Sequence, residues 1–194
     1  MLQHLRLLAP AITVLAFQPA GPAVADGFFL QSDIGSDTRG GVVALQRGPL
    51  TFGANSTDYE GGKELYASVT YALQLGNVGV LKFGPTMGKT WQDEGDDDVR
   101  TGGKVSIERY TPLEFGSVYG LVDLNSVNNS WFVLGQLNSN ALNAGIDLSR
   151  GGSDNYTETT LAFRKGFRDS PFSLRAGYKF DSDEAFLGFS INTF

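Results

Sequence analysis

The chain has 194 residues and a formal net charge of −6, from 15 lysines and arginines and 21 aspartates and glutamates. Nucleic-acid binding needs a basic face, so this acidic balance argues against it, and the absence of cysteine excludes disulfides. The length fits one β domain, and 25 glycines with 12% aromatic residues suit a sheet with tight turns and interfacial rings.

The first 25 residues have the features of a cleaved secretory signal peptide. Arg6 supplies a cation, residues 7–17 form an apolar run, and Ala23-Val24-Ala25 matches a small-residue cleavage site. The run is far shorter than the roughly 20 residues of a membrane-spanning helix. Cleavage after Ala25 would leave residues 26–194 as one β-barrel domain, without His4, the only histidine.

Short runs of alternating apolar and polar residues follow one another along the rest of the chain, separated by turn residues. Alternation with a period of two is typical of a strand with one apolar and one polar face. The clearest run places Leu65, Val69 and Tyr71 opposite Glu64 and Thr70. We predict strands over 27–35, 41–47, 50–57, 64–75, 78–91, 101–111, 114–125, 130–138, 141–149, 155–167, 172–181 and 185–191.

These runs predict an all-β, antiparallel, up-and-down transmembrane β-barrel of about 12 strands, each near the 9–11 residues that cross a tilted bilayer path. Weaker alternation over 27–57 and 114–125 leaves ten strands open, and merged runs would give eight. The expected connections alternate between short and longer ones, as in barrels with tight periplasmic turns and longer outer loops.

The last two runs form a hairpin that ends on an aromatic residue. Residues 172–181 alternate cleanly, Ser182-Asp183 turns the chain, and Phe194 is the final residue. This hairpin resembles the closing hairpin of bacterial outer-membrane β-barrels, with the departure that Asn192 stands where the family prefers an aromatic or apolar residue. The resemblance implies location in the bacterial outer membrane, with Phe194 as the signal that the barrel-assembly machinery reads.

A soluble barrel of the lipocalin or avidin kind would turn its apolar rows inward, whereas a membrane barrel turns them toward lipid. Charged residues occupy the rows between the apolar ones, and in a membrane barrel they would face the lumen and pair with one another. The predicted lumen charges are Lys82, Lys104, Glu108, Asp147, Glu158, Arg164, Arg175 and Lys179, together with Glu64 and Asp181.

Catalysis is not expected. Enzymatic outer-membrane barrels work with a histidine, and the mature chain would have none. A glycosidase needs only two acids, but Glu108, Asp147 and Glu158 share their predicted face with Arg164 and Arg175, which favours ion pairing.

One acidic connection is a candidate cation site. Oxygen-rich loops attract Ca²⁺ or Mg²⁺, but this one lacks the twelve-residue ligand pattern of a specific site. A solvated outer loop without a ligand is favoured, and weak bridging to lipopolysaccharide phosphates is the functional alternative. Its carboxylates are Asp93, Glu94, Asp96, Asp97 and Asp98.

Aromatic residues lie near the predicted strand ends or on the apolar rows, where a membrane barrel carries its interfacial belt. The predicted belt residues are Trp91, Tyr110, Tyr119, Trp131, Tyr156, Phe167, Phe172 and Tyr178.

Taken together, these patterns favour a monomeric outer-membrane barrel, in contact with lipid and lipopolysaccharide, that forms a narrow passive channel for small polar solutes. The alternatives are a closed structural or adhesion barrel with acidic outer loops, and a soluble periplasmic ligand-binding barrel. In size only, the chain is similar to narrow twelve-stranded channels for acidic oligosaccharides, whose basic tracks differ from the mixed charges expected here.

Overall fold

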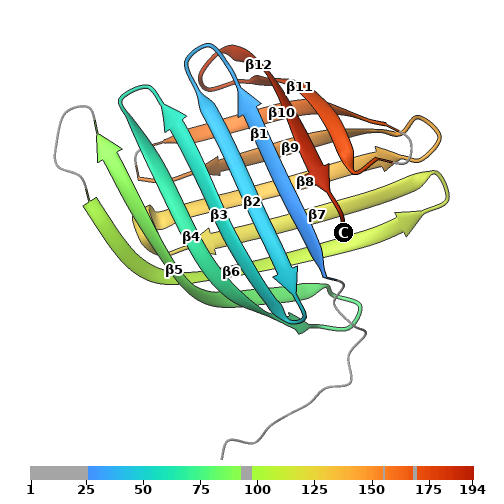
Figure 1. The fold of residues 1–194 in the computed structure, drawn as a ribbon, viewed down its shortest axis with the longest axis horizontal. Helices are drawn as coiled ribbons and strands as arrows, with labels where there is room; N and C mark the ends of the chain where they lie inside the picture. The colour runs from blue at the N-terminus through green and yellow to red at the C-terminus, as the bar shows by residue number, and fades with distance from the viewer. Residues whose placement is uncertain (1–25, 93–97, 155, 168–169) are drawn as a thin grey trace, which may run out of the picture.

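Twelve antiparallel strands form a closed barrel in the computed structural model, which describes residues 26–92, 98–154, 156–167 and 170–194 (Figure 1). No helix in these ranges is long and apolar enough to cross a membrane. The elements are β1 (Gly27–Ile34), β2 (Arg39–Arg47), β3 (Leu50–Tyr59), β4 (Gly62–Gln74), β5 (Val80–Gln92), β6 (Asp98–Leu113), β7 (Gly116–Asn125), the short 3₁₀ turn η1 (Val127–Asn129), β8 (Ser130–Ser139), β9 (Ala144–Gly152), β10 (Thr157–Gly166), β11 (Phe172–Lys179) and β12 (Glu184–Asn192).

Each strand pairs with its neighbours in the sequence, and β1 pairs with β12 to close the ring (Figure 1). The closing register runs from Phe29 opposite Asn192 to Ile34 opposite Leu187. Closure leaves no strand edge with unpaired backbone groups. The predicted up-and-down antiparallel barrel is therefore confirmed, with twelve strands and not ten or eight.

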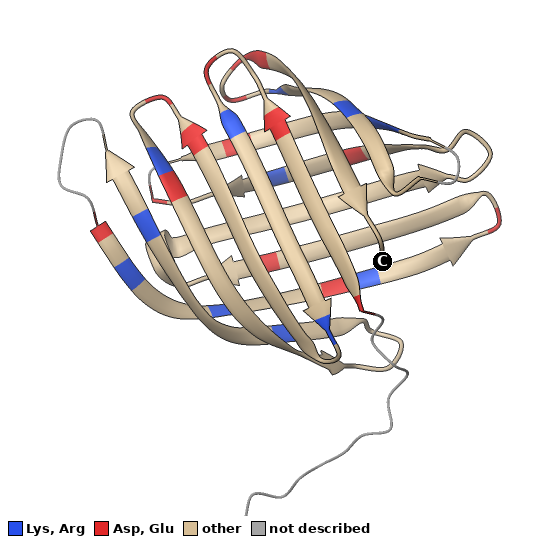
Figure 2. Ribbon diagram, viewed as in Figure 1, with Lys and Arg blue, Asp and Glu red and all other residues tan. Residues whose placement is uncertain are grey.

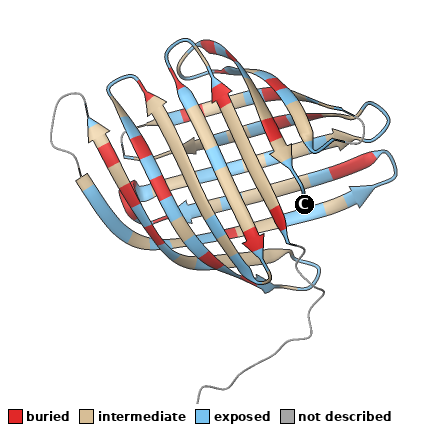
Figure 3. Ribbon diagram, viewed as in Figure 1, coloured by how far each residue is buried: buried red, intermediate tan, exposed pale blue. Residues whose placement is uncertain are grey.

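Apolar side chains cover the outside of the barrel and polar side chains line its inside. On β4, Leu65, Tyr71 and Leu73 are exposed, whereas Glu64 and Thr70 between them are buried. Figure 3 shows the same change between buried and exposed residues along the strands. This arrangement is the reverse of a soluble barrel, which would bury its apolar rows.

The connections differ from the predicted ones. The expected alternation of short and long connections is wrong, because both ends of the barrel carry connections of two to five residues. The β8–β9 connection is longer than predicted, because Asn143 has a left-handed backbone (φ 45°) and β9 begins only at Ala144, instead of at residue 141. β5 ends later than predicted, at Gln92, and β6 begins earlier than predicted, at Asp98, because their pairing continues beyond the predicted ends.

Both ends of the barrel domain lie on the side that we call the terminal end; the opposite side, where β1 leads into β2, is the distal end. Phe194 lies beyond β12 and packs its ring against Gly27, where a Cβ would come within 2.2 Å of it. The Thr193 amide donates to the Phe28 carbonyl at 3.0 Å. The end of the chain is thus tied to β1 although Phe194 is outside the ladder.

The outward apolar wall leads us to expect a lipid covering, which substitution can test. Leu148 lies in the middle of β9 and is 56% exposed, while Leu142, in the β8–β9 connection, is 66% exposed. Leu148→Arg should lower the free energy of unfolding from bilayers by about 2–4 kcal/mol, and Leu142→Arg by about 0–1 kcal/mol. Denaturant titration in liposomes measures both, and equal losses would contradict a lipid-covered wall.

Candidate lumen and its charged lining

Nine of the ten predicted lumen charges, all except Asp181, lie on strands, on the face opposite the exposed apolar rows. Figure 2 shows both signs of charge along the strands and not only in the connections. Sequence analysis missed three inner carboxylates: Asp33, Asp123 and Glu184. Asp33 follows Gln31 in the polar row of β1, which is the signal that could have identified it.

Arg175 is the centre of an ion-pair cluster on one side of the barrel. Its Nε lies 2.9 Å from Asp33 Oδ1 and its Nη1 lies 2.5 Å from Asp147 Oδ2. Arg164 Nη2 donates to Asp147 Oδ1 and to Asn138 Oδ1, both at 2.8 Å. The cluster connects β8, β9, β10, β11 and β1, and the side chains of Arg175 and Asp147 are only 5% and 4% exposed.

Gly188 lets the Arg175 cluster bridge β12. It lies between β11 and β1, opposite both Arg175 and Asp33. A Cβ at Gly188 would lie 2.2 Å from Asp33 Oδ1. A glycine is therefore required where the Arg175–Asp33 pair passes over β12.

Two further ion pairs on the opposite side are more accessible to solvent. Lys82 Nζ lies 2.7 Å from Glu108 Oε1, with side chains 12% and 22% exposed. Lys104 Nζ lies 2.9 Å from Asp123 Oδ2, with side chains 22% and 16% exposed. The Tyr119 hydroxyl donates to Glu108 Oε2 at 2.9 Å. The interior is therefore less tightly packed along β5–β7 than around Arg175.

Lys179 belongs to a cluster that fixes the β1–β2 connection at the distal end. Its Nζ lies 3.2 Å from Glu184 Oε1. Glu184 Oε2 accepts hydrogen bonds from the Asp37 amide at 2.9 Å and the Ser36 hydroxyl at 3.1 Å. Thr38 Oγ1 contacts both Glu184 and Lys179. These charges hold a connection in place more than they line an open path.

Glu158 fixes the β11–β12 connection. Its carboxylate accepts hydrogen bonds from the Asp181 amide at 2.9 Å, the Ser182 amide at 3.1 Å and the Ser182 hydroxyl at 2.7 Å. Asp181 itself is exposed, because β11 ends at Lys179. The prediction that Asp181 lies in the inner row is therefore wrong.

At the distal end, two contacts join the β9–β10 connection to strands on the opposite side of the ring. The rings of Tyr59 and Tyr156 stack with centroids 5.1 Å apart, although β2, β1, β12 and β11 separate β3 from β10. Ser153, after β9, donates its hydroxyl to Glu64 Oε1 on β4 at 3.0 Å. Burial, then nearby carboxylates, raises the pKa of Tyr156, so the ring stays neutral.

Three of the predicted belt aromatics lie on the inner face or inside the barrel instead. Tyr119 bonds Glu108, and Tyr156 stacks on Tyr59. Tyr110 is opposite Tyr119 in the strand register and so shares the inner face of Glu108. Phe167 is exposed, as an interfacial residue would be. Weak alternation in 114–125 hid the orientation of Tyr119, and the contact of Tyr156 is made across the ring.

The β7–β8 connection also turns inward. Val127 in η1 is 2% exposed and Asn128 is 5% exposed. The side-chain amide nitrogen of Asn128, Nδ2, lies 2.8 Å from Thr90 Oγ1 and 3.0 Å from the Tyr66 hydroxyl. The distal end of the lumen therefore contains main chain as well as side chains.

The acidic connection falls largely outside the described residues, which leave out Asp93, Glu94, Asp96 and Asp97. Asp98 is the first residue of β6, with its Oδ2 2.5 Å from Arg100 Nε, and both side chains are about half exposed. Within the described ranges, no group of three or more His, Cys, Asp or Glu residues could hold a metal ion.

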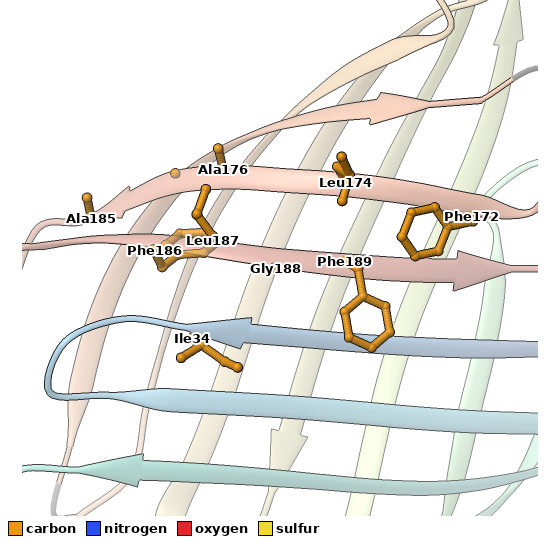
Figure 4. Close-up of a pocket in the computed structure, with 10 residues that line it drawn as sticks. Ile34, Phe172, Leu174, Ala176, Ala185, Phe186, Leu187, Gly188 and Phe189 are labelled. Carbon is orange, nitrogen blue, oxygen red and sulfur yellow. The ribbon is translucent and has the colours of Figure 1, made fainter.

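A shallow apolar depression of about 740 Å³ lies on the outer wall over β1, β11 and β12. Figure 4 shows Leu174 on β11, Leu187 and Phe189 on β12 and Ile34 on β1 around it. Leu174 and Leu187 belong to the exposed apolar rows. The depression suits lipid chains and offers no polar groups for a polar solute.

The solved structures similar to this chain include two KdgM porin chains. One is a KdgM porin in complex with disordered oligogalacturonate, with a TM-score of 0.47 and 9% identity; the other is a KdgM porin, with a TM-score of 0.49 and 8% identity. Each match covers 85% of this chain and 98% of the other. No protein-family model matches the sequence, and neither does any curated protein.

The closed ring of twelve strands, apolar outside and charged inside, is the architecture of a small, porin-like outer-membrane barrel. This architecture rests on the strand pairing and exposure of the chain itself.

The Arg175 cluster predicts a large stability effect. Arg175→Met would leave Asp33 and Asp147 partly without their cation, and removing one partner of a buried pair costs about 3–5 kcal/mol. Arg47→Met is the control, since the Arg47–Asp26 pair is 58% exposed on both sides and such pairs contribute about 0–1 kcal/mol. Urea unfolding of both variants in liposomes gives the comparison, and a loss for Arg175→Met no larger than for the control would refute the structural role.

Proposed function

We propose that the protein lies in the bacterial outer membrane and forms a narrow passive channel for small polar solutes. A closed β-barrel satisfies its backbone hydrogen bonds internally, as a chain surrounded by lipid must. The exposed apolar rows supply the lipid-facing wall, and the charged rows supply a polar interior.

The observation that carries the channel proposal is the solvent exposure of two interior ion pairs. The pairs Lys82–Glu108 and Lys104–Asp123 keep 12–22% of each side chain accessible, against 4–5% for Arg175–Asp147. Charges that water reaches inside a membrane barrel are the groups that set ion selectivity. The conducting path proposed here therefore follows β5, β6 and β7.

The state of the inner carboxylates supports a protein without catalysis. Glu108 and Asp147 are in ion pairs, and Glu158 accepts hydrogen bonds from a connection. Carboxylates held in this way are poor candidates for the paired acid and base of a glycosidase. Loss of His4 with the proposed signal peptide would also remove the only imidazole.

A closed structural barrel is the second candidate. The stacked pair Tyr59–Tyr156 and the Glu64–Ser153 hydrogen bond favour it, because both cross the distal end.

We further propose that the protein is a monomer in contact with lipid and lipopolysaccharide. In this proposal the barrel-assembly machinery inserts it and reads Phe194 as part of the assembly signal. Weak binding of Ca²⁺ or Mg²⁺ by the acidic connection stays a proposal.

Ion selectivity tests the channel. In planar bilayers with a salt gradient, Lys82→Gln should shift the reversal potential toward cation selectivity, because Glu108 then lacks its partner. Glu108→Gln should shift it the opposite way, for the converse reason. Arg47→Gln, in an exposed pair outside β5–β7, should leave the potential unchanged.

The outcomes separate the candidates. Absence of conductance steps from the folded protein would favour the closed barrel over the channel. Recovery in the soluble periplasmic fraction without detergent would refute the membrane location altogether. Shifts of the same sign for Lys82→Gln and Glu108→Gln would show that ions do not pass along this ion pair.

A further inference from the structure

The β7–β8 connection, residues 126–129, indicates what limits the passage of solutes through the barrel. We propose that this inward segment is the constriction of the lumen, held in place through Asn128 by Glu64, Tyr66 and Thr90. Its effect on conductance rests on the proposed channel function, whereas its position inside the barrel does not.

The wall is shaped to receive the segment. A Cβ at Gly88 on β5 would lie 2.8 Å from Val127 Cγ1, and a Cβ at Gly102 on β6 would lie 2.2 Å from Ser126 Oγ. Val127 is 2% exposed and is the largest of the fully buried side chains in the described structure. Two glycines on neighbouring strands thus form a notch that the segment fills.

Hydrogen bonds from the side-chain amide of Asn128 attach the segment to β4 and β5. Asn128 Nδ2 lies 2.8 Å from Thr90 Oγ1, 3.0 Å from the Tyr66 hydroxyl and 3.3 Å from Glu64 Oε1. The Tyr66 hydroxyl donates to Glu64 Oε2 at 2.8 Å. Hydrogen bonds that involve a charged group are the stronger kind, so Glu64 anchors this network.

A second connection covers the segment. The Asp154 amide donates to the Asn128 carbonyl at 2.9 Å, and Asn129 Nδ2 donates to Asp154 Oδ1 at 2.8 Å. Ser153 donates to Glu64 Oε1. Glu64 on β4 therefore contacts the β7–β8 connection and, from across the ring, the β9–β10 connection.

The backbone of the segment requires these contacts. Asn128 and Asn129 have φ values of 54° and 47°, in the left-handed region that non-glycine residues seldom adopt. Asparagine tolerates this region better than most residues, but a strained pair persists only where its surroundings hold it. Loss of the Asn128 amide should therefore release the segment from the lumen.

Single-channel conductance tests whether residues 126–129 are released from the lumen. Asn128→Gly adds no backbone strain but removes the whole side chain, and with it the hydrogen bonds to Glu64, Tyr66 and Thr90. Loss of this attachment alone should raise the single-channel conductance or the open probability severalfold. Asn143→Gly is the matched control, because Asn143 has the same backbone conformation (φ 45°) at the terminal end. If Asn128→Gly and Asn143→Gly both conduct as the unaltered protein does, the constriction is wrong.

Thiol accessibility tests the position without any need for conductance. The chain has no cysteine, so Val127→Cys would introduce a single thiol at the buried position and Leu142→Cys one in an exposed connection. A water-soluble methanethiosulfonate should modify Val127→Cys much more slowly than Leu142→Cys in the folded barrel. Adding Asn128→Gly to Val127→Cys should remove most of that protection.

The two measurements distinguish the two proposals. A protected thiol in a barrel that never conducts would leave the inward segment in place and refute the channel. Equal modification rates for Val127→Cys and Leu142→Cys, in barrels with the same unfolding midpoint, would refute the constriction whatever the conductance.

Discussion

The pairing of β1 with β12 is the constraint on which the rest of the structure depends. Once the ring is closed, every strand has two partners, and each row of side chains must point either out or in. The apolar rows point outward, so the interior has to accommodate the charges of the rows between. A polar interior in lipid is stable only when those charges find partners or water.

The interior solves this problem in two ways. Around Arg175 the charges are packed against one another, and two carboxylates share one guanidinium with little exposure. Along β5–β7 the ion pairs are direct but remain partly accessible. Because a buried charge loses its hydration, the first arrangement depends on complete pairing, whereas the second retains part of its water. The difference divides the interior into a packed side and a side whose charges stay partly accessible.

Alternation in the sequence was sufficient to predict the barrel and the orientation of its clear strands. The predicted orientation of Glu64 and Leu65 on opposite faces is correct, because orientation along a strand is a local property with a period of two. Asp123 was missed, since β7 alternates weakly, and Glu184 was missed because the strand was expected to begin at residue 185. Sequence separation says nothing of contacts such as Tyr59–Tyr156, which arise only when the ring closes.

The connections decide what a closed ring of this size can do. Short connections of two to five residues at both ends leave little chain to cover the openings, yet Val127 and Asn128 in one of them are buried inside the wall. They fit there because Gly88 and Gly102 leave room and because Glu64 on β4, next to β5, offers a charged acceptor. The same wall would leave a wider path if those residues lay outside it. The hydrogen bonds at this one connection, and not the strand count alone, therefore decide how narrow the proposed channel is.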